Sequence, residues 1–251
     1  MPSRRKLFDP ASDEPFAISR TGIEEFVRCP RCFYLRRRLG LAPPRMVPLT
    51  LAVATDALLK EEFDQVREAK KRHPVWDEFD LKVRAFSHEA MELWRNNFKG
   101  IRHLHEPTNL EIFGAVDDVW EHLETSELHI VDYKSTSKQG DPSIEGGGFA
   151  DGYKRQMEIY QWLFRKEGFD VSDEGYFLYV NGSKSGPFFD DELIGNMRFK
   201  TTLIPYNGKT DWVERVLAQC KECLQSEELP EHADGCDNCR YAMDREALER
   251  Q

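Results

Sequence analysis

The segment Glu127–Lys134 constrains the fold more than any other part of this chain, because its residues alternate as a β-strand requires. One face of that strand carries Leu128, Ile130, Asp132 and Lys134. The preceding segment, Leu110–Trp120, is rich in β-branched and aromatic residues around Gly114. We therefore expect the two segments to pair as a hairpin across His122–Ser126.

The rest of the pattern predicts one α/β domain with a helical N-terminal part. Helices are expected from Ser19 or Thr21 into CPRCFYLRRRLGL, and over Thr55–Arg72, His88–Asn97, Tyr153–Glu167 and Asp211–Leu224. Strands are also expected over Gly175–Val180 and Arg198–Pro205, with a long Gly-rich loop over Ser135–Gly152. We expect residues 1–17 to form a flexible arm ahead of a single domain, residues 18–251.

The chain carries 35 lysines and arginines against 45 acidic residues, a formal net charge of −10. This balance argues against a generic nucleic-acid coat protein but is compatible with an enzyme that has a local basic track and an acidic metal site. No apolar run approaches the length of a membrane span, and the N-terminus does not have the form of a secretory signal. We expect a cytoplasmic protein without membrane association.

Asp132 and Lys134 are the first candidates for chemistry, because a two-residue step on a strand places them on one face. A carboxylate can hold a hard divalent cation, and a lysine beside it can orient or deprotonate water or balance charge on a phosphate. The alternative is a strand end that has reached solvent, which the spacing alone favours.

Asp117 comes close to Asp132 if the two strands pair, and two such carboxylates require a cation between them. With Lys134 they would make a phosphodiesterase centre dependent on Mg²⁺. Asp118 should face away, as a surface carboxylate. Gln156 and Tyr160 share a helix face at positions i and i+4, where the ordinary interpretation is a core tyrosine with a solvated glutamine.

Six cysteines form three C-x-x-C pairs: Cys29/Cys32, Cys220/Cys223 and Cys236/Cys239. Without an export signal they are not expected to form a disulfide framework. The first and last pairs can build a four-sulfur site for zinc or an iron–sulfur cluster. Cys220 falls on an apolar helical stripe and is expected in the core.

Taken in order, the segments ISRTGIEEFVRCPRCFYL, GAVDDVW, HIVDYKST and YKRQMEIYQWL resemble the PD-(D/E)XK nuclease superfamily. The resemblance runs from about Ile18 to Tyr241 and is strongest to the RecB-type branch, which includes exonucleases of recombinational repair and CRISPR adaptation. It implies a restriction-endonuclease-like core, a mixed central β-sheet flanked by helices.

The resemblance also implies roles for particular residues. Asp117 and Asp132 match the metal-binding carboxylates, Lys134 the catalytic lysine, and the Tyr133 carbonyl a further metal ligand. Gln156 and Tyr160 match a Q-x-x-x-Y motif that supports the site. The metal would be Mg²⁺ or Mn²⁺.

Asp56 marks a departure from the RecB-type pattern, because it stands where that branch usually has a metal-binding histidine. A carboxylate can replace imidazole as a ligand for Mg²⁺ or Mn²⁺. The alternative, equally weighted, is that Asp56 is only a helix N-cap.

The cysteines depart as well. RecB-type nucleases that carry a [4Fe–4S] cluster usually use one early and three late cysteines, whereas this chain offers Cys29 and Cys32 early and Cys236 and Cys239 late. Zn²⁺ is therefore a rival to [4Fe–4S].

Arginines cluster near the first cysteine pair, with Phe33 and Tyr34 between them, and suit single-stranded DNA; the alternative is a solvated helix face balanced by Glu24 and Glu25. They are Arg28, Arg31, Arg36, Arg37, Arg38 and Arg45, and Lys154 and Arg155 precede Gln156.

The predicted function is a metal-dependent DNA nuclease, an exonuclease on single strands or ends, in repair, recombination or defence. Because the sequence has no Gly-rich phosphate loop of a helicase, we expect it to need free ends, single strands, or a helicase or repair partner. The alternatives are a non-catalytic nucleic-acid-binding subunit of a repair complex and a redox or metal-sensing protein.

Overall fold

The computed structural model describes residues 6–44, 47 and 49–250. Contacts divide the chain into two compact units. The first unit comprises Met1–Val47, Arg102–Gly114 and Asp211–Gln251, and the second comprises Pro48–Ile101 and Ala115–Thr210. Each unit is therefore assembled from segments that are distant in sequence, and single-domain behaviour of residues 18–251 stays a prediction.

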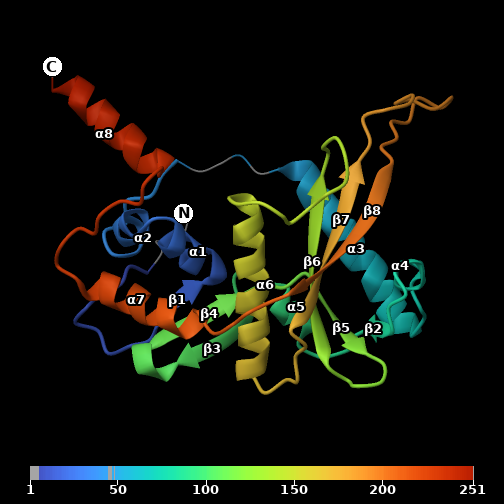
Figure 1. Ribbon diagram of the computed structural model, residues 1–251, viewed down its shortest axis with the longest axis horizontal. Helices are drawn as coiled ribbons and strands as arrows, with labels where there is room; N and C mark the ends of the chain where they lie inside the picture. The colour runs from blue at the N-terminus through green and yellow to red at the C-terminus, as the bar shows by residue number, and fades with distance from the viewer. Residues whose placement is uncertain (1–5, 45–46, 48, 251) are drawn as a thin grey trace. The chain divides into compact units, whose positions relative to one another are not determined.

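The first unit has a three-stranded sheet in the order β1 (Phe16–Ser19), β4 (Leu110–Gly114), β3 (Ile101–His105), in which β1 and β4 run parallel. Ser19 caps α1 (Arg20–Arg28), since its hydroxyl accepts a bond of 3.2 Å from the Gly22 amide. This confirms the predicted start of the first helix. The other elements, drawn in Figure 1, are α2 (Pro30–Arg37), η1 (Glu106–Thr108), α7 (Val213–Gln225) and α8 (Asp237–Glu249).

The predicted arm, residues 1–17, lies partly outside the described residues. In its described part, Phe8 and Phe16 are buried. Their rings meet edge to face with centroids 5.3 Å apart. Residues Phe16 and Ala17 already belong to β1, so this part of the segment is packed and paired.

The second unit has a five-stranded mixed sheet. Its strands are, in spatial order, β2 (Val83–Ala85), β5 (Asp118–His122), β6 (Leu128–Thr136), β7 (Glu174–Gly182) and β8 (Phe199–Asn207). Strands β6 and β7 run parallel, and the other neighbours run antiparallel. The predicted hairpin is confirmed as β5 and β6.

Two helices of the second unit cover opposite faces of β6. Tyr133 packs on Phe63 of α3 (Thr50–Ala69), with ring centroids 5.8 Å apart. The neighbouring residue, Asp132, accepts a hydrogen bond from Gln156 of α6 (Phe149–Lys166). Because adjacent strand residues point to opposite faces, α3 and α6 sandwich the strand. Its charged residues consequently lie in the interior.

The predicted fold class, α/β with a mixed sheet flanked by helices, is confirmed, with the strands divided between two sheets. The expected strand Leu110–Trp120 is broken after Gly114 into β4 and β5. The expected helix His88–Asn97 is only α5 (Met91–Trp94), preceded by the short α4 (Pro74–Glu78). Helix α8, for which Cys236 is the N-cap, was not among the expected helices.

Candidate functional site

The end of the β5–β6 hairpin holds the two predicted carboxylates together. Asp117 immediately precedes β5, and its Oδ2 accepts a hydrogen bond of 2.9 Å from the backbone amide of Tyr133. Asp132 is the preceding residue on β6 and is fully buried. In this register Asp118 pairs with Val131, which places Asp117 beside Asp132. The predicted proximity of Asp117 and Asp132 is therefore present in the fold.

Lys134 lies on the same face of β6 as Asp132, and its ammonium group contacts the Asp132 carboxylate. The ammonium nitrogen also lies 4.5 Å from the centroid of the Tyr153 ring. Burial alone would lower the pKa of Lys134, but the charges of Asp132 and Asp117 raise it above its ordinary value. The lysine is consequently a cation in this setting. Tyr153, expected only as the first residue of a helix, is a neighbour of this site.

Gln156 reaches the same carboxylate from α6. Its amide nitrogen donates a hydrogen bond of 2.7 Å to Asp132 Oδ1 and one of 3.4 Å to the Tyr160 hydroxyl. The pair predicted on one helix face is thus turned toward β6. The glutamine is half-buried, so the ordinary alternative of a solvated side chain does not describe it.

Asp56 lies inside α3, beyond its first turn, and the residue at the N-cap is Leu49. The N-cap interpretation of Asp56 is therefore wrong, because the helix begins earlier than the sequence predicted. Its Oδ2 lies 2.8 Å from the Lys60 ammonium, which in turn lies 3.1 Å from Asp117 Oδ1. Burial and then the charge of Asp117 raise the pKa of Asp56 above its ordinary value.

Lys60 was not anticipated from the sequence. Asp56 and Lys60 form an ordinary i, i+4 pair on a helix, a spacing that gives no sign of a third partner. The contact of Lys60 with Asp117, the residue before β5, and the interaction of Asp56 with the same carboxylate join this pair to the site. We refer to Asp56, Asp117 and Asp132, with Lys60 and Lys134 among them, as the carboxylate centre.

Asp118 is the clearest correction. It faces away from the carboxylate centre, as predicted, but it is completely buried and is not a surface carboxylate. Its oxygens accept bonds from the guanidinium groups of Arg67 and Arg95, and from the Tyr133 hydroxyl at 2.8 Å. The two arginines also contact Asp64. This buried network holds α3 against the back of the hairpin that carries Asp117 and Asp132.

The carboxylate centre fits a hard divalent ion by the chemistry of its donors, because Asp56, Asp117 and Asp132 offer only oxygen. Its oxygens are spread around the two ammonium groups. Within the described residues, the four cysteines form the one group in which three or more candidate ligand atoms lie within 4.8 Å of one another. A metal ion at the carboxylates therefore shares this space with Lys60 and Lys134.

The first unit brings together Cys29, Cys32, Cys236 and Cys239 as predicted. The sulfur of Cys32 lies 3.6 Å from those of Cys236 and Cys239, and the Cys29 and Cys239 sulfurs are 3.8 Å apart. Burial alone would raise the pKa of Cys29, but backbone hydrogen bonds from Ala233 and Cys32 lower this pKa to about 7. Cys220 is buried among apolar residues of α7, as expected.

Most of the predicted basic track has partners inside the first unit. Arg36 and Arg37 pair with Glu25, and Arg31 donates to the Pro230 carbonyl at 2.8 Å. Arg38 donates to the Tyr34 hydroxyl at 3.2 Å, whereas Arg28 is exposed. These pairings favour the structural alternative over the DNA-binding one, and contact with DNA stays a prediction. Arg45 lies outside the described residues.

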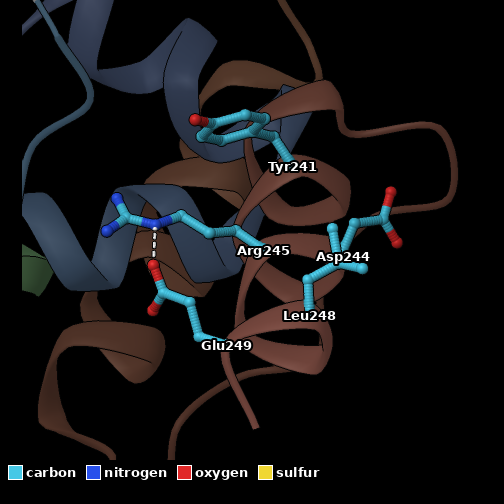
Figure 2. Close-up of a pocket in the computed structure, with 5 residues that line it drawn as sticks. All are labelled: Tyr241, Asp244, Arg245, Leu248 and Glu249. Carbon is cyan, nitrogen blue, oxygen red and sulfur yellow. Dashed lines mark hydrogen bonds and ion pairs between the residues drawn. The ribbon is translucent and has the colours of Figure 1, made fainter. Parts of the chain in front are cut away.

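The pocket in Figure 2 contains none of these candidates. It is an open groove on one helix, α8, where Arg245 Nε pairs with Glu249 Oε1 at 2.6 Å. Its lining is completed by Tyr241, Asp244 and Leu248. This hollow on α8 therefore does not mark the candidate chemistry of the chain.

The family model of the PD-(D/E)XK nuclease superfamily matches residues 17–243. The chain belongs to this superfamily, whose members hydrolyse nucleic acids with divalent metal ions. A search of curated proteins returned no match. Among solved structures, the chain is similar to a protein from Eubacterium rectale that is provisionally named an exonuclease.

That structure shares 12% sequence identity with the chain and gives a TM-score of 0.41, with 96% of this chain and 92% of that chain covered. In the part of the chain that the structure describes, every helix is too short or too polar to cross a bilayer.

Proposed function

We propose that this protein is a metal-dependent DNA nuclease of the RecB-like branch, acting on single strands or free ends. The observation that carries the proposal is the convergence on the Asp132 carboxylate of β6: Gln156 bonds Asp132, Lys134 contacts the same carboxylate, and Asp117 is held beside them. These are the residues that the family motifs select, and they come from three separate segments of the second unit.

Each side chain of the site has a different role in the proposed reaction. A divalent ion held by Asp117 and Asp132, with Asp56 and the Tyr133 carbonyl as further candidates, would activate water and stabilise charge on the phosphate. Lys134 would balance negative charge that develops on the phosphate oxygens. Gln156 fixes the orientation of Asp132, and the Tyr133 amide fixes that of Asp117. Tyr160 in turn positions Gln156.

Metal-dependent cleavage tests this function. Purified protein is incubated with end-labelled single-stranded and double-stranded DNA in Mg²⁺ or Mn²⁺, with and without EDTA. We expect cleavage that EDTA stops and that Asp132→Asn lowers by at least about 100-fold. The matched control is Asp141→Asn, since Asp141 is an exposed carboxylate that pairs with Lys200 on β8. A folded wild-type protein that binds DNA and cleaves neither form would favour the alternative, a non-catalytic subunit.

We infer that the four-cysteine site takes a structural zinc ion. Four sulfurs about 2.3 Å from a tetrahedral zinc stand about 3.8 Å from one another. The three sulfur–sulfur distances of 3.6 to 3.8 Å among these cysteines match that edge. A [4Fe–4S] cluster puts an iron atom beneath each cysteine and so needs wider spacing. Elemental analysis of anaerobically purified protein tests this inference: one zinc per chain is expected, and four irons would contradict it.

A further inference from the structure

Lys60 is built into the carboxylate centre rather than lying at its edge. It follows Asp56 by one helical turn, and its ammonium group spans Asp56 Oδ2 at 2.8 Å and Asp117 Oδ1 at 3.1 Å. Its side chain is 23% exposed, and that of Asp117 is 20% exposed. A solvated helix pair would leave the lysine free to swing between partners. Here the Lys60 ammonium instead connects α3 with the residue that precedes β5.

Charge counting shows what this cation does to the site. The three carboxylates carry −3 and the two ammonium groups of Lys60 and Lys134 carry +2, leaving −1. One divalent ion brings the total to +1, which a phosphodiester anion neutralises. A second divalent ion would bring it to +3 in a largely buried space, where like charges repel strongly.

The position of Lys60, like the charge count, disfavours a second divalent ion. An ion bridging Asp56 and Asp117 would need the oxygen atoms that face the Lys60 ammonium. Asp117 Oδ2 is already turned toward the Tyr133 amide and β6. On the Asp132 side of Asp117 an ion does not have to displace Lys60, although it shares the Asp132 carboxylate with the Lys134 ammonium and the Gln156 amide.

We propose that Lys60 is the fixed cation of the Asp56–Asp117 half of the centre, so that the centre takes up one divalent ion, on the Asp117–Asp132 side. The ammonium group replaces a second metal ion. This inference rests on the proposed function, because it assumes that the carboxylates bind metal. Lys60 is on this account a positioning residue that sets the number of ions.

The test counts bound Mn²⁺ by electron paramagnetic resonance on protein whose cysteine site is loaded as purified. Wild type, Lys60→Gln and Lys60→Met are compared, and the methionine variant keeps the apolar stem if glutamine disturbs folding. Lys60→Arg retains the cation. Lys71→Gln removes the same charge just beyond the C-terminal end of α3, where the side chain is exposed. The double variant Lys60→Gln/Asp56→Asn removes a ligand of the new site.

We expect one Mn²⁺ in wild type, Lys60→Arg and Lys71→Gln, and two in the neutral Lys60 variants. The double variant should return to one, and Asp132→Asn should lose the wild-type ion. Two ions in wild type, or one ion in folded Lys60→Gln and Lys60→Met, would overturn the role of Lys60. Wild type that binds no Mn²⁺ would instead overturn the proposed function itself.

Discussion

Asp117 and Asp118 are neighbours in sequence and have opposite surroundings. Asp117 faces the Tyr133 amide and Lys60, whereas Asp118 is buried against Arg67 and Arg95. Strand alternation predicts that the two face apart. It does not predict that the second face is also covered. The two arginines come from α3 and from the end of α5, and no local pattern connects them with a residue on β5.

Asp118→Asn should destabilise the protein strongly. The substitution leaves the buried guanidinium groups of Arg67 and Arg95 with less opposing charge, and breaking a buried ion pair costs about 3–5 kcal/mol. Urea unfolding measures the loss. Glu124→Gln is the control, because Glu124 pairs with Lys82 in an exposed position, and it should leave the unfolding midpoint nearly unchanged. Equal midpoints for the two variants would refute the structural role of the Asp118 network.

At the scale of elements, the sequence predicted the bounds of helices and strands best where a long series of apolar residues packs into the core. Helices α6 and α7 and strands β6, β7 and β8 lie within a few residues of their expected bounds. Helix α3 begins at Thr50, whereas the sequence predicted Thr55. The prediction missed the first turn because its apolar residues Leu51 and Val53 are exposed and do not continue the buried apolar stripe of the helix. Strand β1 was missed because its four residues are stabilised by pairing with β4, far away in sequence.

The candidate site was predictable to the extent that motif order revealed it. Asp132 and Lys134 follow from alternation, and Gln156 and Tyr160 from helical spacing. Lys60 could not be found in this way, because its role depends on a contact between two elements. Helix α8 was missed for a related reason: Cys239 is its one buried residue, so it has no apolar face to read.

Gly175→Ala tests the packing between β6, β7 and α6. A methyl group at this position would collide with the Met157 sulfur and lie 3.0 Å from the Ile130 carbonyl oxygen. Overpacking of this kind costs about 1–3 kcal/mol. Thermal unfolding should show a lower midpoint for this variant. Gly147→Ala is the control, since its nearest neighbour would be Asp151 Oδ2 at an ordinary 3.6 Å; a midpoint for Gly175→Ala equal to the control would contradict this packing.

At the scale of the whole molecule, an N-terminal and a C-terminal segment of the chain each bring two cysteines to one site in the first unit. Cys29 and Cys32 flank the start of α2, and Cys236 and Cys239 lie at the start of α8. The overall net charge of −10 does not predict that the four cysteines come together. A metal ion at four sulfurs would fix the C-terminal segment to the N-terminal helices within the unit, contributing directly to folding.

Cys236→Ser should lower both metal content and stability, because it removes one of four ligands and leaves the site open. Zinc content by elemental analysis and the thermal midpoint are measured together. Cys223→Ser is the matched control: Cys223 lies on α7 in the same unit, outside the four-sulfur group. Zinc content and midpoint that are unchanged in Cys236→Ser would show that the four cysteines do not hold a structural ion.

The most direct test of the whole account is the rate at which wild type and Lys134→Ala cleave a labelled DNA single strand in Mn²⁺. Lys134 contacts Asp132 and lies over the Tyr153 ring, whereas the control residue Lys184 is exposed. Wild type and Lys184→Ala should cleave at the same rate, with EDTA stopping both, and folded Lys134→Ala should not cleave. Full cleavage by Lys134→Ala would contradict the assignment of this centre as the catalytic one.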